Sequence, residues 1–448
     1  MTDAAVVAET EDGVELTVDD AVDMAVGLMR KKQLKGAAEI LESVLEIEPA
    51  RADALNYLGV VRFHLDGPAK SIEILNRAAE MAPAHAGIRN NLGNAYVELG
   101  DTDAAVAAYD RAIELDPNLA DPYANLAAIV KYAGNDGFAE KLLRKAIDIN
   151  PEFGVAHQNL ASILLDTGRA REAIDYFWKA TVHLPDKGVP AHFLALAYWF
   201  AGLKDLAIDF VKKWADANPN DAQAQHMRAS MTGENVPDRA SDIYVRKLFD
   251  QFASSFDAKL DSLEYRAPEL VGDAVTAAVG RDATGLAILD AGCGTGKCAK
   301  YFKPHAARLV GVDLSGGMLT NANKLGLYDY LERAELTEYL LSQPGTYDVV
   351  ASADTLCYFG RLEEFSEAAA ASLRPGGVLV FTVEALDGAE EDFRLAVNGR
   401  YTHSEPYVRK CLGEAGLQVV SCGREKLRTE NAEPVIGLVV TARLARLF

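Results

Sequence analysis

Apolar positions along the chain follow two different patterns, which divide it into two halves. Up to about residue 240 the apolar and small residues recur in helical patterns, each stopped by a turn. Further on, short apolar strands alternate with helical stretches, which predicts a doubly wound α/β domain. The four strands expected in that domain cover residues 286–290, 308–314, 347–352 and 377–383. Two later apolar runs, residues 417–422 and 434–444, can close the sheet as an antiparallel hairpin.

A series of prolines marks the first half at a fixed interval of 34 residues. Proline cannot continue a helix, because its ring removes a donor and restricts the residue before it. Thirty-four residues is the tetratricopeptide (TPR) period. The series is Pro49, Pro83, Pro117, Pro151, Pro185 and Pro219.

Small residues recur at fixed positions inside this period and allow paired helices to approach closely. Glycines stand at the turn inside the unit, where a helix end favours a residue that tolerates positive φ. We expect six repeats over residues 18–221, and this half resembles the TPR family; Ser71 departs from the alanine expected in the second repeat. The small residues are Gly59, Gly93, Ala127, Ala161 and Ala195, and the turn glycines are Gly100, Gly134, Gly168 and Gly202.

A TPR superhelix has a concave face, and such faces bind extended peptide or protein. Asn91, Asn125 and Asn159 occupy one repeat position in successive units, with Asn94 beside them. Because an amide both donates and accepts, such a row can hold a peptide backbone. The alternative is that asparagine is simply common at this position in TPR sequences.

Charge and composition narrow the set of partners. The net charge is -21, with 37 acids against 23 bases up to residue 240 and 29 against 22 beyond it. Neither half has the basic field that grips nucleic acid or anionic membranes. The chain also lacks an apolar run that could span a bilayer, so we expect neither nucleic acid nor membrane as partner. The acidic leader, residues 1–17, does not resemble a signal peptide, which favours the cytoplasm.

The segment between the halves changes character twice. Residues 222–240 predict a capping helix followed by a Gly- and Pro-containing linker, and residues 241–285 predict lead-in helices with aromatic residues at helical spacing. This second stretch resembles the segment that folds over the cofactor in TPR-linked and small-molecule methyltransferases. The resemblance implies lid or cofactor contacts, and ordinary packing of an amphipathic helix is the alternative. The candidates are Tyr244, Phe252, Phe256, Tyr265 and Arg266.

The loop after the first strand of the α/β half carries the clearest chemical signal. Asp290 is followed by Gly292, Cys293, Gly294 and Gly296, in the pattern D-x-G-x-G-x-G at a strand-to-helix junction. Glycines there permit a sharp turn and close approach of a ligand. The pattern resembles the first motif of class I S-adenosylmethionine-dependent methyltransferases. The resemblance implies a Rossmann-like, mostly parallel seven-stranded sheet over residues 286–448, whose loop wraps the methionine part of the cofactor.

Acidic residues at the ends of the next strands extend this cofactor site. Asp313 ends the second strand, 23 residues after Asp290, where a carboxylate can accept hydrogen bonds from both ribose hydroxyls. Leu314 and Met318 follow it. The resemblance further implies that Glu335 lies near the adenine amino group and that Leu336 packs on the adenine face.

Polar residues after the fourth and fifth strands are the candidates for catalysis, because open α/β sheets place substrate sites there. They are Asp354, Tyr358, Glu384, Arg400, Tyr401 and His403. His403 is a candidate base, and the alternative is that it caps a helix over residues 404–415. Methyl transfer from a sulfonium needs alignment of the reacting groups and, where the acceptor requires it, removal of a proton, and it needs no metal.

These features predict an S-adenosylmethionine-dependent methyltransferase that leaves S-adenosylhomocysteine and whose TPR half recruits a protein substrate or partner. One alternative is a small-molecule methyltransferase in which the repeats only dock the enzyme to an assembly. Another is a scaffold with a vestigial cofactor site. The fold admits carbon, nitrogen, oxygen and sulfur acceptors alike.

Overall fold

The structure is a computed structural model of the whole chain. It describes residues 6–9, 15–184, 189–253, 256–257, 260, 263–388, 391–430 and 433–445. The chain forms two compact units, one of Met1–Leu160 with Trp178–Lys187 and the other of Ala161–Phe177 with Gly188–Phe448. The second unit therefore holds the last helices of the repeat half as well as the α/β domain.

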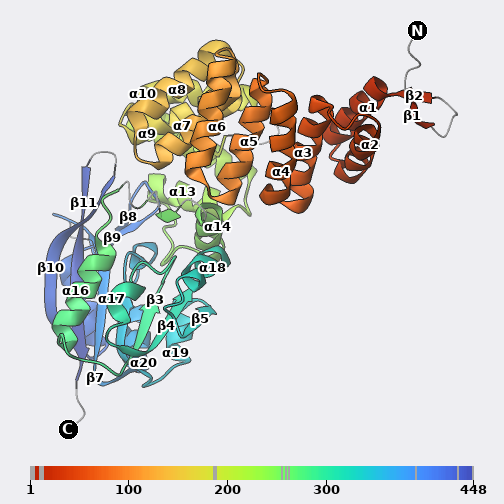
Figure 1. Cartoon of the computed structure of the whole chain (residues 1–448). Helices are drawn as coiled ribbons and strands as arrows, with labels where there is room; N and C mark the ends of the chain where they lie inside the picture. The colour runs from red at the N-terminus through yellow and green to blue at the C-terminus, as the bar shows by residue number, and fades with distance from the viewer. Residues whose placement is uncertain are drawn as a thin grey trace. The chain divides into compact units, whose positions relative to one another are not determined.

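The repeat half is built of successive helices joined by short turns (Figure 1). A short antiparallel pair, β1 (Val6–Glu9) with β2 (Glu15–Thr17), precedes them. The helices are α1 (Val18–Arg30), α2 (Leu34–Ile47), α3 (Ala52–Asp66), α4 (Pro68–Met81), α5 (Ala86–Leu99), α6 (Thr102–Leu115), α7 (Ala120–Tyr132), α8 (Asp136–Ile149), α9 (Gly154–Asp166), α10 (Ala170–His183), α11 (Ala191–Phe200), α12 (Lys204–Ala217) and α13 (Ala222–Thr232).

The helix ends follow the proline series. Each second helix of a pair, from α2 to α12, ends two residues before one of its prolines; Pro185 itself lies outside the described residues. Gly100 follows α5 with φ +85°, the left-handed conformation expected at the turn. The TPR superhelix predicted for this half is confirmed.

Close helix contact explains the small residue at one repeat position. A Cβ built on Gly93 in α5 would lie 2.4 Å from a ring carbon of Tyr109 in α6, inside van der Waals contact. Tyr109 is itself 2% exposed, so its ring has little room to move away.

Gly93→Ala is therefore expected to lower the free energy of unfolding by about 1–3 kcal/mol, measured by urea unfolding, because the added methyl overpacks this interface. Gly137→Ala is the matched control in α8, where a Cβ would meet nothing within 4 Å. That change should stabilise the helix by roughly 0.5–1 kcal/mol, since alanine is the better helix former. Equal effects at the two sites would contradict this account.

The α/β domain is a mixed sheet in the order β10-β11-β7-β6-β3-β4-β5. Neighbours from β7 to β5 run parallel, and β11 runs antiparallel to both of its neighbours, β7 and β10. The mostly parallel Rossmann-like fold is thereby confirmed. The strands are β3 (Leu286–Ala291), β4 (Ala306–Asp313), β5 (Tyr330–Arg333), β6 (Tyr347–Ser352), β7 (Leu373–Ala385), β10 (Leu417–Glu430) and β11 (Glu433–Leu444).

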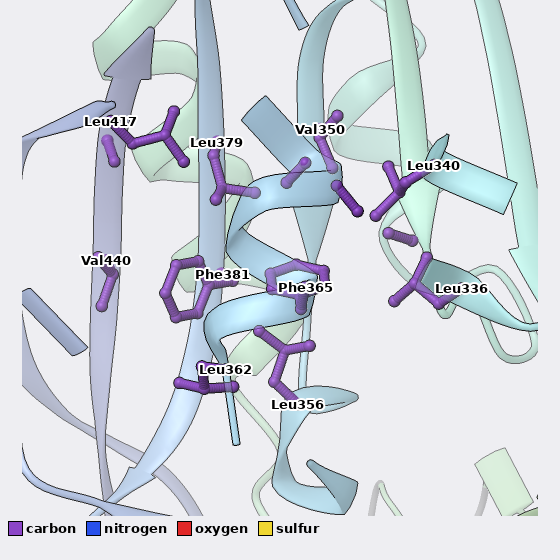
Figure 2. Packing of buried hydrophobic residues seen from close by; sticks show 14 of the residues in the cluster. Leu336, Leu340, Val350, Leu356, Leu362, Phe365, Leu379, Phe381, Leu417 and Val440 are labelled. Carbon is purple, nitrogen blue, oxygen red and sulfur yellow. The ribbon is translucent and has the colours of Figure 1, made fainter. Parts of the chain in front are cut away.

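Helices cover both faces of this sheet. Leu289 of β3 faces the core under α19 (Leu336–Leu341), α20 (Glu363–Ser372) and α21 (Glu405–Glu414). Figure 2 shows part of this core, in which Phe365 and Phe381 pack with Leu362 and Leu379. The next residue, Ile288, faces the opposite core under α16 (Ala267–Val279) and α17 (Ala299–Phe302). The alternation follows from the two-residue period of strand side chains.

The structure differs from the expected strands at the carboxyl edge. Strand β10 continues to Glu430, well past the expected end at residue 422. Two short strands, β8 (Phe393–Leu395) and β9 (Tyr401–His403), form a hairpin where a loop was expected, and β9 pairs with the end of β7. Two further helices, α14 (Asp242–Phe252) and α18 (Gly316–Lys324), lie near that edge.

The described part of the chain lacks two other features. No helix there has the length and apolar character needed to cross a membrane. No group of three or more His, Cys, Asp or Glu side chains there is arranged to hold a metal ion.

Candidate functional site

The glycine loop has the shape that its sequence predicts. Gly292, Gly294 and Gly296 have φ values of +77°, +53° and +89°, which side-chain-bearing residues rarely adopt. A Cβ on Gly292 would lie 2.2 Å from Thr355 Oγ1, whereas a Cβ on Gly294 would meet no atom of the described residues within 4 Å. The loop is thus packed at Gly292, while the described residues leave space beside Gly294.

Two aspartates end the parallel strands on either side of this loop. Asp313 Oδ2 accepts a hydrogen bond from the Gly294 N–H at 2.9 Å, and its Oδ1 accepts one from the Ser315 N–H at 2.8 Å. Asp290 is 1% exposed, and its Oδ2 accepts from the Tyr328 hydroxyl at 2.6 Å. Burial raises the pKa of Asp290 to about 7 and also raises the pKa of Asp313. Both carboxylates would gain from a ligand that supplies positive charge or further donors.

The lead-in segment contacts this edge of the sheet through polar side chains. Asp250, in α14, accepts from the Ser315 hydroxyl at 2.5 Å. Asp257 accepts from the Thr295 hydroxyl, also at 2.5 Å, and the Asn321 amide donates to the Ala253 carbonyl at 2.7 Å. The segment therefore lies over the glycine loop and the start of α18, in the place where a lid is expected.

The individual aromatic residues of this segment occupy different places. Tyr244 stacks on His226 with ring centroids 4.3 Å apart, and its predicted cofactor contact stays a prediction. The Arg266 side chain is on the surface, 3.8 Å from Glu425, and the cofactor contact predicted for it stays a prediction. Tyr265 is half-buried next to Ala353, close to the substrate side. Phe256 packs edge-to-face on Phe249 at 5.7 Å. The side chain of Phe252 lies outside the described residues.

The residues predicted around ribose and adenine are mostly structural in their present contacts. Glu335 begins α19 as its N-cap, and its Oε2 accepts from the Glu338 N–H at 2.8 Å. Leu336 and Met318 are 6% and 1% exposed, and Leu336 packs in the core with Leu340. The Leu314 carbonyl accepts from Arg333 Nε at 3.2 Å. Cys293 is buried beneath the loop. Their contacts with a cofactor stay predictions.

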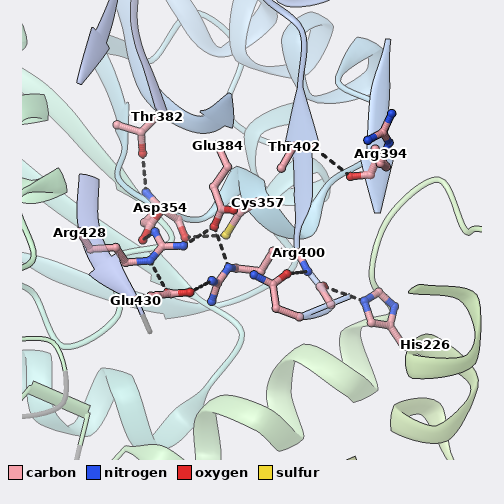
Figure 3. Close-up of polar contacts among 12 residues, drawn as sticks. His226, Asp354, Cys357, Thr382, Glu384, Arg394, Arg400, Thr402, Arg428 and Glu430 are labelled. Atoms are coloured by element: carbon pink, nitrogen blue, oxygen red, sulfur yellow. Dashed lines mark hydrogen bonds and ion pairs between the residues drawn. The ribbon is translucent and has the colours of Figure 1, made fainter. Parts of the chain in front are cut away.

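Five charged side chains form a buried network at the carboxyl ends of β6 and β7, named here the charge cluster. Its members are Asp354, Glu384, Arg400, Arg428 and Glu430 (Figure 3). Arg428, on β10, lies 2.5 Å from both Asp354 and Glu430, and it also pairs with Glu384. Arg400 Nε lies 2.7 Å from Glu384 Oε1 without hydrogen-bond geometry, and its Nη2 bonds Glu430.

The cluster is strongly desolvated, with the Arg428 side chain only 3% exposed. Burial alone would raise the pKa of Glu430, but the neighbouring Arg400 and Arg428 outweigh it and lower that pKa. Asp354 has φ +57°, an uncommon conformation for a non-glycine residue. Among the described residues, its buried Oδ1 has no hydrogen-bond partner. Strain and an unpaired buried oxygen are features that gather at functional sites.

The other predicted catalytic residues require correction. His403 is fully buried, its Nε2 lies 3.0 Å from the Gly360 carbonyl, and burial lowers its pKa to about 4. Tyr401 is equally buried and donates to the Pro237 carbonyl at 2.8 Å. Neither side chain is accessible in this structure, because hairpin β8–β9 packs both inside. Tyr358 is half-buried and packs edge-to-face on Phe249 at 5.5 Å.

The buried, neutral His403 predicts a pH dependence of stability. Its pKa is about 4 when folded and 6.5 as an ordinary histidine, so between these values the unfolded chain binds more protons. The contribution of His403 to the free energy of unfolding is then fully present above pH 6.5 and is lost as the pH drops toward 4. The free energy of unfolding, measured with urea at pH 7.5 and at pH 5, should fall between these pH values in the wild type. In His403→Gln this fall should be smaller by about 2 kcal/mol. An equal loss would contradict the burial of a neutral imidazole.

Some asparagines of the repeat half bond to asparagines of a neighbouring repeat. Asn91 donates to Asn56 Oδ1 at 2.9 Å, and Asn125 donates to Asn90 and Asn94 at 3.0 Å. Asn159 is half-buried in α9. Amides of successive repeats are therefore hydrogen-bonded in pairs, and an amide in such a pair retains capacity for a further bond.

Family models match both parts of the chain. A model described as a methyltransferase domain matches residues 289–381, which include the glycine loop, Asp313 and Asp354. Models described as a TPR repeat and a tetratricopeptide repeat match residues 93–131 and 22–86.

Similar proteins agree with the methyltransferase match. Methyltransferase-like protein 27 from Homo sapiens is 38% identical over 117 residues, 26% of this chain and 46% of that protein. A malonyl-[acyl-carrier protein] O-methyltransferase from Enterobacter lignolyticus is 29% identical over 136 residues, 30% of this chain and 53% of that protein. The chain thus spans about half the length of these curated relatives.

A solved structure of Burkholderia thailandensis 1,6-didemethyltoxoflavin-N1-methyltransferase is 23% identical, with a TM-score of 0.38 over 47% of this chain and 93% of that one. This likeness is too low to support a further inference. The family models and the curated relatives carry the assignment. The chain therefore carries tetratricopeptide repeats and a methyltransferase domain.

Proposed function

We propose that the α/β domain binds S-adenosylmethionine and transfers its methyl group to an acceptor that the repeat half recruits. One observation carries the proposal. The glycine loop and Asp313 meet at the carboxyl ends of adjacent parallel strands, β3 and β4, where doubly wound sheets bind their ligands.

The residues at this edge fit such a cofactor. The positive φ angles of the loop glycines and the space that the described residues leave beside Gly294 let a ligand approach the backbone. Asp313 offers carboxylate oxygens for ribose hydroxyls, now engaged by two backbone N–H groups. Buried Asp290, with its raised pKa, would be stabilised in its ionised form by the ammonium group of the methionine part.

The charge cluster is the proposed acceptor side. When bound, the cofactor supplies a methyl group on a sulfonium sulfur, so the protein need only align the acceptor and, for some acceptors, accept a proton. Asp354 lies near the glycine loop. The next residue, Thr355, donates a hydrogen bond from its hydroxyl to the Gly292 carbonyl at 3.2 Å. The unpaired Oδ1 of Asp354 can accept a hydrogen bond from the acceptor group. Glu384 and Glu430 form ion pairs with the two arginines and belong to the same side of the proposed site.

We propose that the repeat half recruits a protein or peptide, either as substrate or as partner. Asn91, Asn94 and Asn125 support this, because their amides are hydrogen-bonded between successive repeats and an amide can both donate to and accept from a peptide backbone. A small or carrier-linked acceptor is the second candidate, favoured by the similarity to a malonyl-[acyl-carrier protein] O-methyltransferase.

Methyl-labelled S-adenosylmethionine, incubated with the protein and a cell extract, tests the function and separates these candidates. We expect label in the extract with the wild type and none above background with Asp313→Ala. Label in the side chains of a polypeptide supports recruitment of a protein substrate, and label in the small-molecule fraction or in the acyl group of a carrier protein supports the second candidate. Binding of cofactor without any transfer would favour a scaffold with a vestigial site.

A further inference from the structure

A histidine from the helix after the repeats reaches the acceptor side of the site. His226, in α13, is 5% exposed, and its Nε2 lies 2.8 Å from the Gly399 carbonyl, 173 residues away (Figure 3). A carbonyl can only accept, so Nε2 carries the proton and donates. Gly399 directly precedes Arg400 of the charge cluster.

The imidazole is held in place from two sides. It stacks on Tyr244 of α14 with ring centroids 4.3 Å apart, and it meets the Tyr401 ring edge-on at 6.2 Å. Burial lowers the pKa of His226, which keeps the ring neutral with one N–H to donate. Its orientation is therefore fixed by packing, and the hydrogen bond follows from that orientation.

The turn that receives this hydrogen bond is tight and fitted to its neighbours. It joins β8 to β9, with hydrogen bonds from the Ala396 N–H to the Arg400 carbonyl at 2.8 Å and from the Gly399 N–H back to the Ala396 carbonyl at 2.9 Å. Gly399 has φ +84°, and a Cβ there would lie 2.8 Å from the Tyr244 hydroxyl. The turn thus lies directly against α13 and α14, and its next residue enters the charge cluster.

We propose that His226 is a positioning residue for the acceptor side of the methyl-transfer site. By holding the Gly399 carbonyl, it fixes the turn that places Arg400 against Glu384 and Glu430. The inference rests on the proposed function. Helix α13 packs on α12 through Met227 and Val211. The last helices of the repeat half therefore support the position of His226 and, through it, the acceptor side.

Two substitutions separate the hydrogen bond from the packing. His226→Phe keeps a ring to stack on Tyr244 and loses the donor, whereas His226→Gln keeps an amide donor at similar reach and loses the ring. His64→Gln, at an exposed histidine of α3, is the control. Hydrogen exchange of the full chain, followed by mass spectrometry, reports on residues 396–403. We expect exchange there to be at least about tenfold faster in His226→Phe and close to the wild type in His226→Gln.

The labelled-methyl assay gives the functional readout. His226→Phe should raise the amount of extract needed for half-maximal labelling at least about fivefold, with His226→Gln restoring most of the loss. The affinity of His226→Phe for S-adenosylhomocysteine should match that of the wild type. Unchanged exchange in His226→Phe, or an equal loss of cofactor affinity, would overturn the proposal. If the wild type bound no S-adenosylhomocysteine, the proposed function would fail, and the exchange of residues 396–403 would still decide whether His226 holds the turn.

Discussion

Arg428→Met is expected to lower the free energy of unfolding by about 3–5 kcal/mol, because it leaves buried carboxylates without their cation. Arg428 pairs with Asp354, Glu384 and Glu430, and its side chain is 3% exposed. Methionine fills a similar volume, so the loss measures the uncompensated charge more than a cavity. Urea unfolding followed by circular dichroism measures it.

Arg424→Met is the matched control on the same strand. Arg424 is exposed and pairs with exposed Asp387 at 2.6 Å, an ion pair of the kind that contributes about 0–1 kcal/mol. Comparable losses for Arg424→Met and Arg428→Met would show that the charge cluster is not the buried network described. Lowering the pH should partly restore Arg428→Met, because protonation removes the unpaired charges.

Gly292→Ala is expected to weaken binding of S-adenosylhomocysteine at least about tenfold, roughly 1.4 kcal/mol or more. Alanine must adopt φ +77° there, and its Cβ would lie 2.2 Å from Thr355 Oγ1. The loop can accommodate the methyl only by moving, which displaces the backbone that faces the cofactor. Calorimetric titration measures the loss.

Gly285→Ala separates backbone strain from this displacement. Gly285 has φ +79°, close to that of Gly292, but a Cβ there would meet nothing within 4 Å and the residue precedes β3. We expect this variant to lose about 1 kcal/mol of stability and to bind S-adenosylhomocysteine like the wild type. Normal binding by Gly292→Ala as well would mean that the loop does not contact the cofactor.

The fold was predictable because its signals are local. The 34-residue proline series fixes where helices stop, and the run from Asp290 to Gly296 joins a buried strand to a helix within a few residues. The cofactor edge follows, since parallel strands bring Asp290 and Asp313 to the same end of the sheet.

The acceptor side was less predictable because it depends on distant contacts. The stretch that follows Cys422 is GREKLRTE. Its many charged residues interrupt the apolar pattern that predicts a strand, so the expected strand ended at residue 422. In the sequence, Arg428 has the pattern of an exposed strand residue. Its burial depends on ion pairs with Asp354 and Glu384, which lie 74 and 44 residues away in the chain. His403 resembles a base in sequence, but hairpin β8–β9 buries it. His226 lies in a helix that its sequence marks only as a cap.

The most direct test is calorimetric titration of the full chain with S-adenosylhomocysteine, comparing the wild type with Asp313→Ala and with Asp273→Ala, an exposed aspartate on α16. The cofactor site described here predicts saturable binding by the wild type and by Asp273→Ala, and its loss in Asp313→Ala. Absence of binding by the wild type, or undiminished binding by Asp313→Ala, would contradict it.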